Sequence, residues 1–497
     1  MAFKYGIEEL TLHQAIALAK GEIKGVLVHE AIDKIDSCRE HVELILHSNK
    51  AFYGINTGFG PLCDTKISID DTNLLQENLL ITHAVGVGKP IPKLLSKLML
   101  VFKIHALSQG YSGVRLELIQ RLLYFLEHDL IPVVPEQGSV GASGDLAPLS
   151  HLFLPLIGQG EFWYGNQIRS AEEVLSTHHL EPIKLEAKEG LALINGTQFI
   201  LAFASLGLWK MKYLLDLADL AGAMSLEGFR ASAAPFKVAI HQVRPFKGTI
   251  KVAERIRMFL KDSDNLSSHK NCNRVQDPYS IRCIPQVHGA SRNAFEHLKE
   301  LTEVEMNAIT DNPIIFSSEE VISGGNFHGQ PLAMALDYAT VAASELGNIS
   351  DRRCYLLLEG KYDLPRLLTV KGGLNSGMMI PQYTTAALTS ENKSLCFPAS
   401  SDSIPTSLGQ EDHVSMGSIS GRKFNQVLDN LEKILSIELM YAAQAIEFRR
   451  PFKCSELLEK NHALIRSKVA KLEEDRPLKK DIDAIVQLVR DRSFITH

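Results

Sequence analysis

The segment Val427-Leu-Asp-Asn-Leu-Glu-Lys-Ile-Leu-Ser-Ile-Glu-Leu-Met-Tyr-Ala442 repeats apolar residues at steps of three and four. Residues at this spacing share one face of an α-helix, which a neighbouring element can cover. The longer stretch 416–448 has no proline and a single glycine in its interior, Gly421. It therefore predicts a helix of the length found in helical bundles. Similar spacing occurs in three other segments, 116–126, 202–224 and 336–358.

Signals for β-strands are few, so the pattern predicts a mainly α fold. The clearest are two short apolar runs at 314–316 and 321–322, on either side of the polar residues 317–320. Each run is long enough only for a short strand.

The composition is that of an ordinary globular protein with a large core. The 497 residues are 45% hydrophobic and 22% charged, with 52 Lys and Arg, 58 Asp and Glu and a formal net charge of -6. These values exclude a disordered chain, a collagen-like repeat and a disulfide-stapled miniprotein. Without a basic excess the chain is not expected to bind nucleic acid, because phosphates need cationic partners.

The lack of a visible targeting signal and the cysteine usage favour a cytoplasmic protein. The N-terminal segment has no basic stretch followed by an apolar run, and the longest uncharged run, 190–209, is too polar at its start for a membrane span. The cysteines never form a CxxC pair, which favours reduced thiols and predicts no metal site. There are seven, Cys38, Cys63, Cys272, Cys283, Cys354, Cys396 and Cys454.

Five glycine-rich loops of low charge interrupt the helical pattern. Glycine permits backbone conformations and close approaches that side chains forbid, and sites are often built on polar loops between rigid helices. One such loop alone is typical of a simple helix connection. Five of them, each with Asn, Ser, Thr or Tyr, predict a site. The loops span 53–60, 137–145, 195–198, 324–329 and 372–377.

The most informative loop continues as Gly138-Ser-Val-Gly-Ala-Ser-Gly-Asp-Leu-Ala-Pro-Leu-Ser-His151. At its centre, the nitrogen of Gly144 can approach the carbonyl of Ala142, and the hydroxyl of Ser143 can leave as water. The loop is not a P-loop, because no Lys-Ser/Thr pair follows it. It is not a nucleophile elbow either, because Asp145 occupies the last glycine position of G-x-S-x-G.

From the Tyr-Gly-Ile-Asn-Thr-Gly loop at 53 to Gln-Glu-Asp-His-Val-Ser-Met-Gly at 410–417, the chain resembles the aromatic amino acid ammonia-lyases, most closely their histidine-specific members. The resemblance implies that Ala142, Ser143 and Gly144 cyclise and lose two waters to form an electrophilic methylideneimidazolone (MIO) group. No metal or nucleotide cofactor is implied. The substrate is expected to be a small molecule, with neither nucleic acid nor membrane as a partner.

The resemblance also implies an architecture. The expected fold has a long central helical bundle and a smaller mixed N-terminal region that carries the active-site loops. We place the N-terminal region with the MIO segment at 1–200 and the bundle with the C-terminal helices at 201–497, as parts of one integrated unit. Members of the family are homotetramers, and each active site is built from more than one subunit.

Two tyrosines match the family's candidates for the base that takes the β-proton of the substrate, Tyr53 and Tyr279, and we favour Tyr279. A phenol with a pKa of about 10 needs nearby positive charge or donors for this task. Arg282 matches the residue that binds the substrate carboxylate, which a guanidinium can hold with two hydrogen bonds. Gln276 precedes it by six residues and would share its face in a helical or turn-like segment.

Two further residues are implied to be neighbours of the MIO group. Asn195 would hydrogen-bond the oxygen of the group, and Phe327 would pack beside the group and the substrate. Judged without the resemblance, an aromatic residue such as Phe327 is more typical of a core.

His83 and Glu411 decide the expected substrate. His83 lies where family members contact the substrate ring, and a polar residue there argues against phenylalanine. Glu411, next to Gln410 on the substrate side, matches histidine-specific members. A carboxylate can accept an imidazole N–H, whereas a phenyl ring would leave it without a partner at a cost of about 1–3 kcal/mol or more. The expected reaction converts L-histidine to trans-urocanate and ammonia. Without the resemblance, Glu411 reads as the acidic start of a helical turn.

Three other functions stay open at this point. The first is a tyrosine ammonia-lyase or aminomutase on the same scaffold. The second is another all-α elimination enzyme, because 373–381 is similar to the Ser-x-x-Met-Pro loop of fumarase-type lyases, although the Lys and second Asn of that loop are missing. The third is an inactive helical scaffold, in which Ser143 keeps its hydroxyl.

Overall fold

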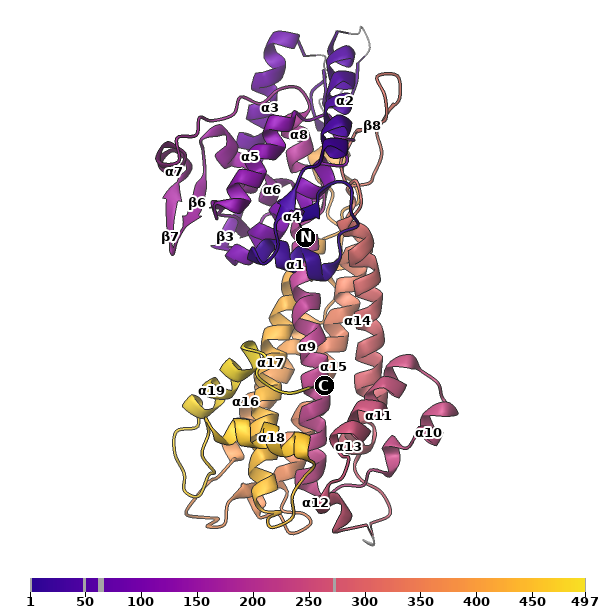
Figure 1. The fold of residues 1–497 in the computed structure, drawn as a ribbon, viewed down its shortest axis with the longest axis vertical. Helices are drawn as coiled ribbons and strands as arrows, with labels where there is room; N and C mark the ends of the chain where they lie inside the picture. The colour runs from indigo at the N-terminus through magenta and orange to yellow at the C-terminus, as the bar shows by residue number, and fades with distance from the viewer. Residues whose placement is uncertain (1, 48–50, 61–66, 271–273, 497) are drawn as a thin grey trace. The chain divides into compact units, whose positions relative to one another are not determined.

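The computed structural model describes residues 2–47, 51–60, 67–270 and 274–496, and it is mainly α, as predicted (Figure 1). The chain divides into two compact units, each made of three segments. The first unit comprises Met1–Leu206, Leu298–Leu336 and Pro398–Arg422, and the second comprises Gly207–His297, Asp337–Phe397 and Lys423–His497. Four long helices span the division points, α9 (Gln198–Phe229), α14 (Ile284–Met306), α15 (Gln330–Leu358) and α17 (Gly417–Glu447).

The helices expected from apolar spacing are confirmed. The segment 116–126 is α5 (Leu116–Glu127), and the three longer segments lie within α9, α15 and α17. The other helices of the first unit are α1 (Leu12–Lys20), α2 (His29–Leu46), α3 (Ile69–His83), α4 (Lys93–Leu107), α6 (Leu146–Phe153), α7 (Ala171–Thr177) and α8 (Glu189–Ile194), with 3-10 turns at Leu154–Ile157, Ala399–Ser401 and Ser407–Gly409.

The strands of the first unit form small separate sheets. The strands are β1 (Phe3–Lys4), β2 (Gly25–Val26), β3 (Val87–Pro90), β4 (Ile131–Pro132), β5 (Pro135–Gln137), β6 (Glu161–Tyr164), β7 (Gln167–Ser170), β8 (Ile314–Ile315) and β9 (Val321–Ile322). β1 and β2 pair in parallel, whereas β3–β5, β4–β6–β7 and β8–β9 are antiparallel. β8 and β9 lie where the sequence indicates short strands, and they pair with each other.

Three helices of the first unit position the loops of interest. α3, α6 and α8 pack against one another in all three pairings. His83 is the last residue of α3, the segment 142–144 comes shortly before α6, and Asn195 directly follows α8. α4 forms the buried centre of this region, with every residue from Leu98 to Leu107 buried. A rigid, closely packed set of helices therefore holds the loop ends.

The second unit is a helical assembly around the buried part of α17. Its own helices are α10 (Val238–Gln242), α11 (Lys247–Phe259), α12 (Asp264–Ser267), α13 (Tyr279–Arg282), α16 (Met379–Leu395), α18 (Glu456–Arg466) and α19 (Lys479–Arg490), with 3-10 turns at Ala234–Phe236 and Arg366–Leu368. The sequence predicts one apolar stripe on α17, but every residue from Ile434 to Ile446 is buried. The helix is therefore surrounded on all sides, as expected for the centre of a bundle.

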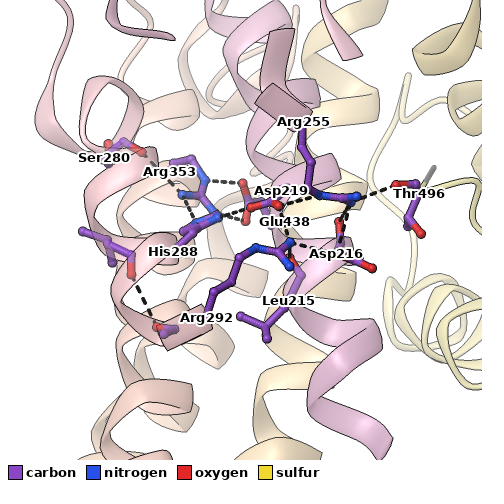
Figure 2. Close-up of polar contacts among 12 residues, drawn as sticks. Leu215, Asp216, Asp219, Arg255, Ser280, His288, Arg292, Arg353, Glu438 and Thr496 are labelled. Carbon is purple, nitrogen blue, oxygen red and sulfur yellow. Dashed lines mark hydrogen bonds and ion pairs between the residues drawn. The ribbon is translucent and has the colours of Figure 1, made fainter. Parts of the chain in front are cut away.

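Buried charges in the second unit form one hydrogen-bonded network (Figure 2). Glu438 of α17 accepts two hydrogen bonds from the guanidinium of Arg353, at 2.5 and 2.8 Å, and further bonds from Ser225 and Ser350 at 2.7 and 2.6 Å. Glu438 and its three partners come from α9, α15 and α17, which the network holds side by side. Removing one member of a buried charged pair costs about 3–5 kcal/mol, because the other charge is left without a partner.

Asp219 is the second centre of this network. It accepts hydrogen bonds from Arg255 and from His288, each at 2.8 Å, and from Arg292 (Figure 2). Burial alone would raise the pKa of Asp219, but the attraction of Arg292, His288 and Arg255 outweighs it and lowers the pKa. The carboxylate is therefore held in its charged form.

The described helices include none that is long and apolar enough to cross a membrane. Five of the cysteines, Cys38, Cys283, Cys354, Cys396 and Cys454, are free thiols. Cys63 and Cys272 lie outside the described residues.

Candidate active site

The Ala142-Ser143-Gly144 segment forms a tight turn with an unusual backbone. Ser143 has φ +47° and Gly144 has φ +79°, both in the left-handed region. A non-glycine residue in this region carries strain unless its surroundings hold it there. The turn packs against the segment that follows Glu411, since Ala142 clusters with Val414 and Met416.

The turn is held against the loop after α8. Gly144 and Gly196 form an isolated parallel β-bridge. The N–H of Gly196 donates to the carbonyl of Ser143 at 3.3 Å, and the N–H of Asp145 donates to the carbonyl of Gly196 at 2.8 Å. A Cβ on Gly144 would lie 2.1 Å from the Gly196 oxygen. Only glycine fits between these two strands of backbone.

Asp145 fixes the same turn to the start of α9. Its buried carboxylate accepts the backbone N–H groups of Phe199 and Ile200 at 3.1 and 3.0 Å, and the hydroxyl of Ser139 at 2.9 Å. These N–H groups belong to the first turn of α9, where backbone N–H groups have no carbonyl acceptor in their own helix. Burial raises the pKa of Asp145 to about 7, against the lowering effect of the three donors.

Glu411 lies directly beside the turn, although 268 residues separate it from Ser143. The hydroxyl of Ser143 donates to one carboxylate oxygen of Glu411 at 3.0 Å. The other carboxylate oxygen accepts from Thr406 at 2.8 Å and from Ser407 at 2.9 Å. Glu411 forms a β-bridge with Thr406 and does not begin a helix, because α17 starts only at Gly417.

Two adjoining cavities of the first unit meet at Ser143 and Glu411. One has a volume of about 430 Å³ and the other of about 700 Å³. Tyr53, Gly60, Ser143 and Glu411 line both. Of the other residues predicted for the site, His83 and Asn195 line the first cavity, and Ala142, Phe327 and Gln410 line the second. The structure therefore brings together eight predicted residues, counting Tyr53, Ser143 and Glu411, with Gly144 beside them.

His83 and Tyr53 both line the first cavity. Burial lowers the pKa of His83, although the Leu79 carbonyl and the charge of Glu411 both act to raise it. The imidazole therefore favours its neutral form. The hydroxyl of Tyr53 accepts the N–H of Gly60 at 3.4 Å, and its ring meets Phe59 edge to face.

Asn195 is fixed through both its side chain and its backbone. Its side-chain nitrogen donates to the carbonyl of Asn312 at 2.8 Å, which leaves the second hydrogen of the amide for another acceptor. Its own carbonyl accepts from the ammonium of Lys103 at 2.5 Å.

The other three predicted residues, Gln276, Tyr279 and Arg282, belong to the second unit and line neither cavity. Tyr279 and Arg282 begin and end the short helix α13, and Gln276 precedes it. The side chain of Tyr279 is 69% exposed, and the guanidinium of Arg282 stacks on its ring at 4.3 Å from the ring centre. Arg282 also donates to the carbonyl of Asp277 at 2.9 Å. The buried network reaches this helix, because Arg353 donates to the carbonyl of Ser280 at 3.4 Å (Figure 2).

Comparison with known proteins decides the family. The family model for aromatic amino acid lyases matches residues 10–467. The histidine ammonia-lyase of Symbiobacterium thermophilum is 47% identical over 488 residues, which cover 98% of this chain and 96% of that protein. The chain belongs to the aromatic amino acid lyase family. The resemblance seen in the sequence is thereby confirmed.

Solved structures of other lyases and mutases share the fold. The crystal structure of histidine ammonia-lyase from Trypanosoma cruzi matches this lyase with a TM-score of 0.91 at 42% identity, covering 99% of this chain and 94% of that one. A tyrosine aminomutase from Streptomyces globisporus matches with a TM-score of 0.94 at 32% identity, covering 99% and 98%. The fold therefore serves more than one reaction, and the choice between them depends on the site.

The residues of this lyase fit an MIO group at 142–144. The backbone is already turned back at Ser143 and Gly144, and glycine at 144 leaves room for the Gly196 backbone that packs against the turn. The hydroxyl of Ser143 donates to the carboxylate of Glu411, and the side-chain amide of Asn195 has a hydrogen available for an acceptor.

Several residues that shape the site are not found by sequence reasoning. Thr406 and Ser407 orient Glu411 but lie in a segment without a local signal. His328 and His413 both line the second cavity, and the His328 ring nitrogen Nε2 is 3.2 Å from the carbonyl of His413. Lys103 had a signal that was missed, a single charge inside the apolar run Leu98–Leu107.

Proposed function

We propose that this lyase converts L-histidine to trans-urocanate and ammonia, using an MIO group formed from Ala142, Ser143 and Gly144. The observation that carries the proposal is the carboxylate of Glu411, 3.0 Å from the Ser143 hydroxyl and on the wall of both cavities. The high identity to histidine ammonia-lyases over nearly the whole chain supports the same substrate.

Maturation would use only atoms of the turn itself. The nitrogen of Gly144 bonds to the carbonyl carbon of Ala142, and the carbonyl oxygen leaves as water with the hydrogens of the Gly144 and Ser143 nitrogens. The hydroxyl of Ser143 then combines with the hydrogen on Cα and leaves as a second water. The result is an electron-poor double bond that activates the amino acid for loss of ammonia. The turned-back backbone at Ser143 and Gly144 already restricts the turn, which lowers the entropic cost of closing the ring.

Maturation also changes the surroundings of Glu411. When Ser143 loses its hydroxyl, one oxygen of the Glu411 carboxylate loses its donor, while Thr406 and Ser407 still hold the other. The released oxygen faces the cavity and can accept an N–H of the substrate imidazole. A charge-assisted hydrogen bond of this kind is worth about 1.5–3 kcal/mol, and a phenyl ring cannot supply it. The neutral ring of His83 offers a second polar contact to the imidazole.

The remaining tasks are removal of a β-proton and binding of the substrate carboxylate. We assign the proton to Tyr279, with Tyr53 as the alternative base, and the carboxylate to Arg282, with Gln276 nearby. The guanidinium of Arg282 stacks on the ring of Tyr279, which keeps the two groups together. These groups line neither cavity of the first unit, so we propose that another subunit contributes them.

A homotetramer with shared active sites would provide this arrangement. The second unit exposes large apolar side chains on the helices α15 and α16, which supports burial against another copy. They include Tyr338, Val341 and Tyr355 on α15, and Ile380 and Tyr383 on α16, each 43–61% exposed.

The proposed function is tested with wild type and Ser143→Ala side by side. Wild type should be lighter than its sequence mass by two waters, about 36 Da, and should produce urocanate from L-histidine, followed by its absorbance. Ser143→Ala has no hydroxyl to lose, so it should keep its helical content, show no loss of the second water and lose most turnover. A wild-type chain at full mass would identify an inactive scaffold.

The substrate is tested by giving purified enzyme L-histidine and L-tyrosine in parallel. A tyrosine ammonia-lyase or aminomutase has support in the likeness to the tyrosine aminomutase fold. We expect faster turnover of L-histidine, because the Glu411 carboxylate has a partner in imidazole. Faster turnover of L-tyrosine would replace the proposed substrate while leaving the MIO group in place.

A further inference from the structure

Lys103 is a buried lysine at the centre of the first unit. It lies in α4, and its side chain is 2% exposed. Lysine is almost never buried without a compensating partner, because an ammonium loses its hydration there. Burial lowers the pKa of Lys103 to about 7, with partial compensation from the charge of Asp311. A residue that is this unfavourable to bury is expected to make contacts that depend on it.

The contacts of Lys103 are backbone carbonyls next to the active site. Its ammonium donates to the carbonyl of Ala192 at 3.0 Å and to that of Asn195 at 2.5 Å. Ala192 lies in the last turn of α8, and Asn195 directly follows that helix. The last carbonyls of a helix have no intrahelical partners, and positive charge at this end is favourable.

The carbonyl of Asn195 and the N–H of Gly196 belong to one peptide group. That N–H donates to the carbonyl oxygen of Ser143 at 3.3 Å. A cation on the carbonyl side draws electron density through the peptide, so the N–H becomes a stronger donor. The Ser143 carbonyl oxygen is retained in the proposed maturation, because the two oxygens that leave come from the Ala142 carbonyl and the Ser143 hydroxyl. A hydrogen bond to it therefore acts during ring closure and on the finished electrophile.

Two buried lysines lie near Asn195, one next to its side-chain contact and one on its backbone carbonyl. Its side chain donates to the carbonyl of Asn312, and the neighbouring Asp311 is paired with Lys188 at 2.7 Å. Lys103 instead supports the backbone of Asn195. The loss of Lys103 therefore leaves the side-chain contact in place and removes the charge behind the 195–196 peptide.

We propose that Lys103 is a positioning residue that holds and polarises the Asn195–Gly196 peptide against the carbonyl oxygen of Ser143. This inference rests on the proposed function, because it concerns maturation of the same turn and turnover by the mature site. Lys103 does not touch the reacting atoms and acts only through the peptide.

The test compares Lys103→Met and Lys103→Gln with Lys103→Arg. Met and Gln remove the charge, and Gln keeps an N–H donor, which protects folding if Met is too disruptive. Arg keeps both charge and donors. We expect both neutral variants to contain a larger fraction of chains at full mass, measured on the intact protein. Their kcat per mature site should fall at least about tenfold with KM changed far less, and Arg should recover most of the loss.

Leu98→Ala is the matched control for stability, because Leu98 is fully buried five residues earlier in the same helix. It should lower the melting temperature and leave both the mature mass and kcat at wild-type levels. The proposal is overturned if neutral variants mature fully with kcat within about twofold of wild type, or if Leu98→Ala reproduces their defects. A wild-type protein without dehydration or turnover would instead refute the proposed function.

Discussion

At the scale of single residues, the site depends on backbone positions that side chains would block. The run Ala-Ser-Gly is readable in the sequence, and the family resemblance predicts its role. The sequence does not show why glycine is needed at 144. Only the structure brings Gly196 against it, with the oxygen of Gly196 2.1 Å from the place of a Cβ. Thr406 and Ser407, which donate hydrogen bonds to Glu411, were also missed, because hydroxyl residues in a loop form no recognisable sequence pattern.

Gly144→Ala is expected to stop maturation without unfolding the protein. The new methyl group would collide with backbone, which cannot move aside as a flexible side chain can, and φ +79° adds strain. Intact mass should show chains that keep both waters, and turnover of L-histidine should be lost. Gly165→Ala is the matched control, because Gly165 also has positive φ but nothing lies within 4 Å of its Cβ position. Normal mass and activity in Gly144→Ala would contradict the proposed crowding.

Glu411→Gln is expected to lower kcat/KM for L-histidine by about 10-fold to 150-fold, the value of a hydrogen bond to a charged group. The amide keeps the size of the side chain but weakens acceptance of the imidazole N–H. Steady-state kinetics measure the loss, and intact mass should still show dehydration at Ser143. Asp402→Asn, an exposed carboxylate of the same segment, should leave the rate unchanged. An unchanged rate in Glu411→Gln would remove the residue from substrate recognition.

At the scale of elements, the long helices are the part of the fold that local sequence predicts. Apolar spacing identifies α5, α9, α15 and α17 because the buried face of each helix appears as regularly spaced apolar residues in its own sequence. The convergence of loops does not follow from local patterns. Ser143 and Glu411 meet across 268 residues, and Asp145 binds the first turn of α9 across 54 and 55 residues. Such contacts depend on packing among α3, α6 and α8, which the sequence alone leaves open.

The helix α4 is expected to make the stability of the first unit sensitive to acid through His105. This buried imidazole accepts the N–H of Gly6 at 3.2 Å and lies 3.2 Å from the Asn307 side chain. Burial lowers the pKa of His105 to about 4, against a smaller raising effect of Asn307. Between pH 4 and about 6.5 the unfolded chain binds more protons than the folded one, so stability rises with pH across this window. At pH 4 the loss would be about 3 kcal/mol.

The measurement is the melting temperature from pH 7 down to pH 4 for wild type and His105→Asn. Asparagine can accept the Gly6 N–H but cannot take up a proton, so the variant should lose less stability than wild type as the pH falls. His29→Asn, at an exposed position on α2, should follow wild type. Parallel curves for wild type and His105→Asn would exclude His105 as the source of the acid sensitivity.

At the scale of the whole molecule, the predicted site residues fall into two groups that the structure describes separately. Eight line the cavities of the first unit, and Gln276, Tyr279 and Arg282 belong to the second. Sequence motifs predict both groups but cannot say which subunit supplies each one, because a motif contains no information about subunit contacts. The boundary at residue 200 and the homotetramer stay predictions.

Complementation between inactive subunits tests whether the active site is shared. Ser143→Ala removes the electrophile, and Tyr279→Phe removes the proposed base from a side chain that is 69% exposed. Each variant alone should be inactive. If every site takes Ser143 from one subunit and Tyr279 from another, random co-assembly leaves about a quarter of the sites with both groups intact. If one subunit supplies both groups, no site recovers.

The matched control is co-expression of wild type with the doubly substituted chain. If the sites are shared between subunits, about a quarter of them stay intact; if each site lies within one subunit, about half stay intact. Activity of the purified mixed tetramers therefore separates the two arrangements in both experiments, and no recovery in the first with half activity in the second would refute sharing.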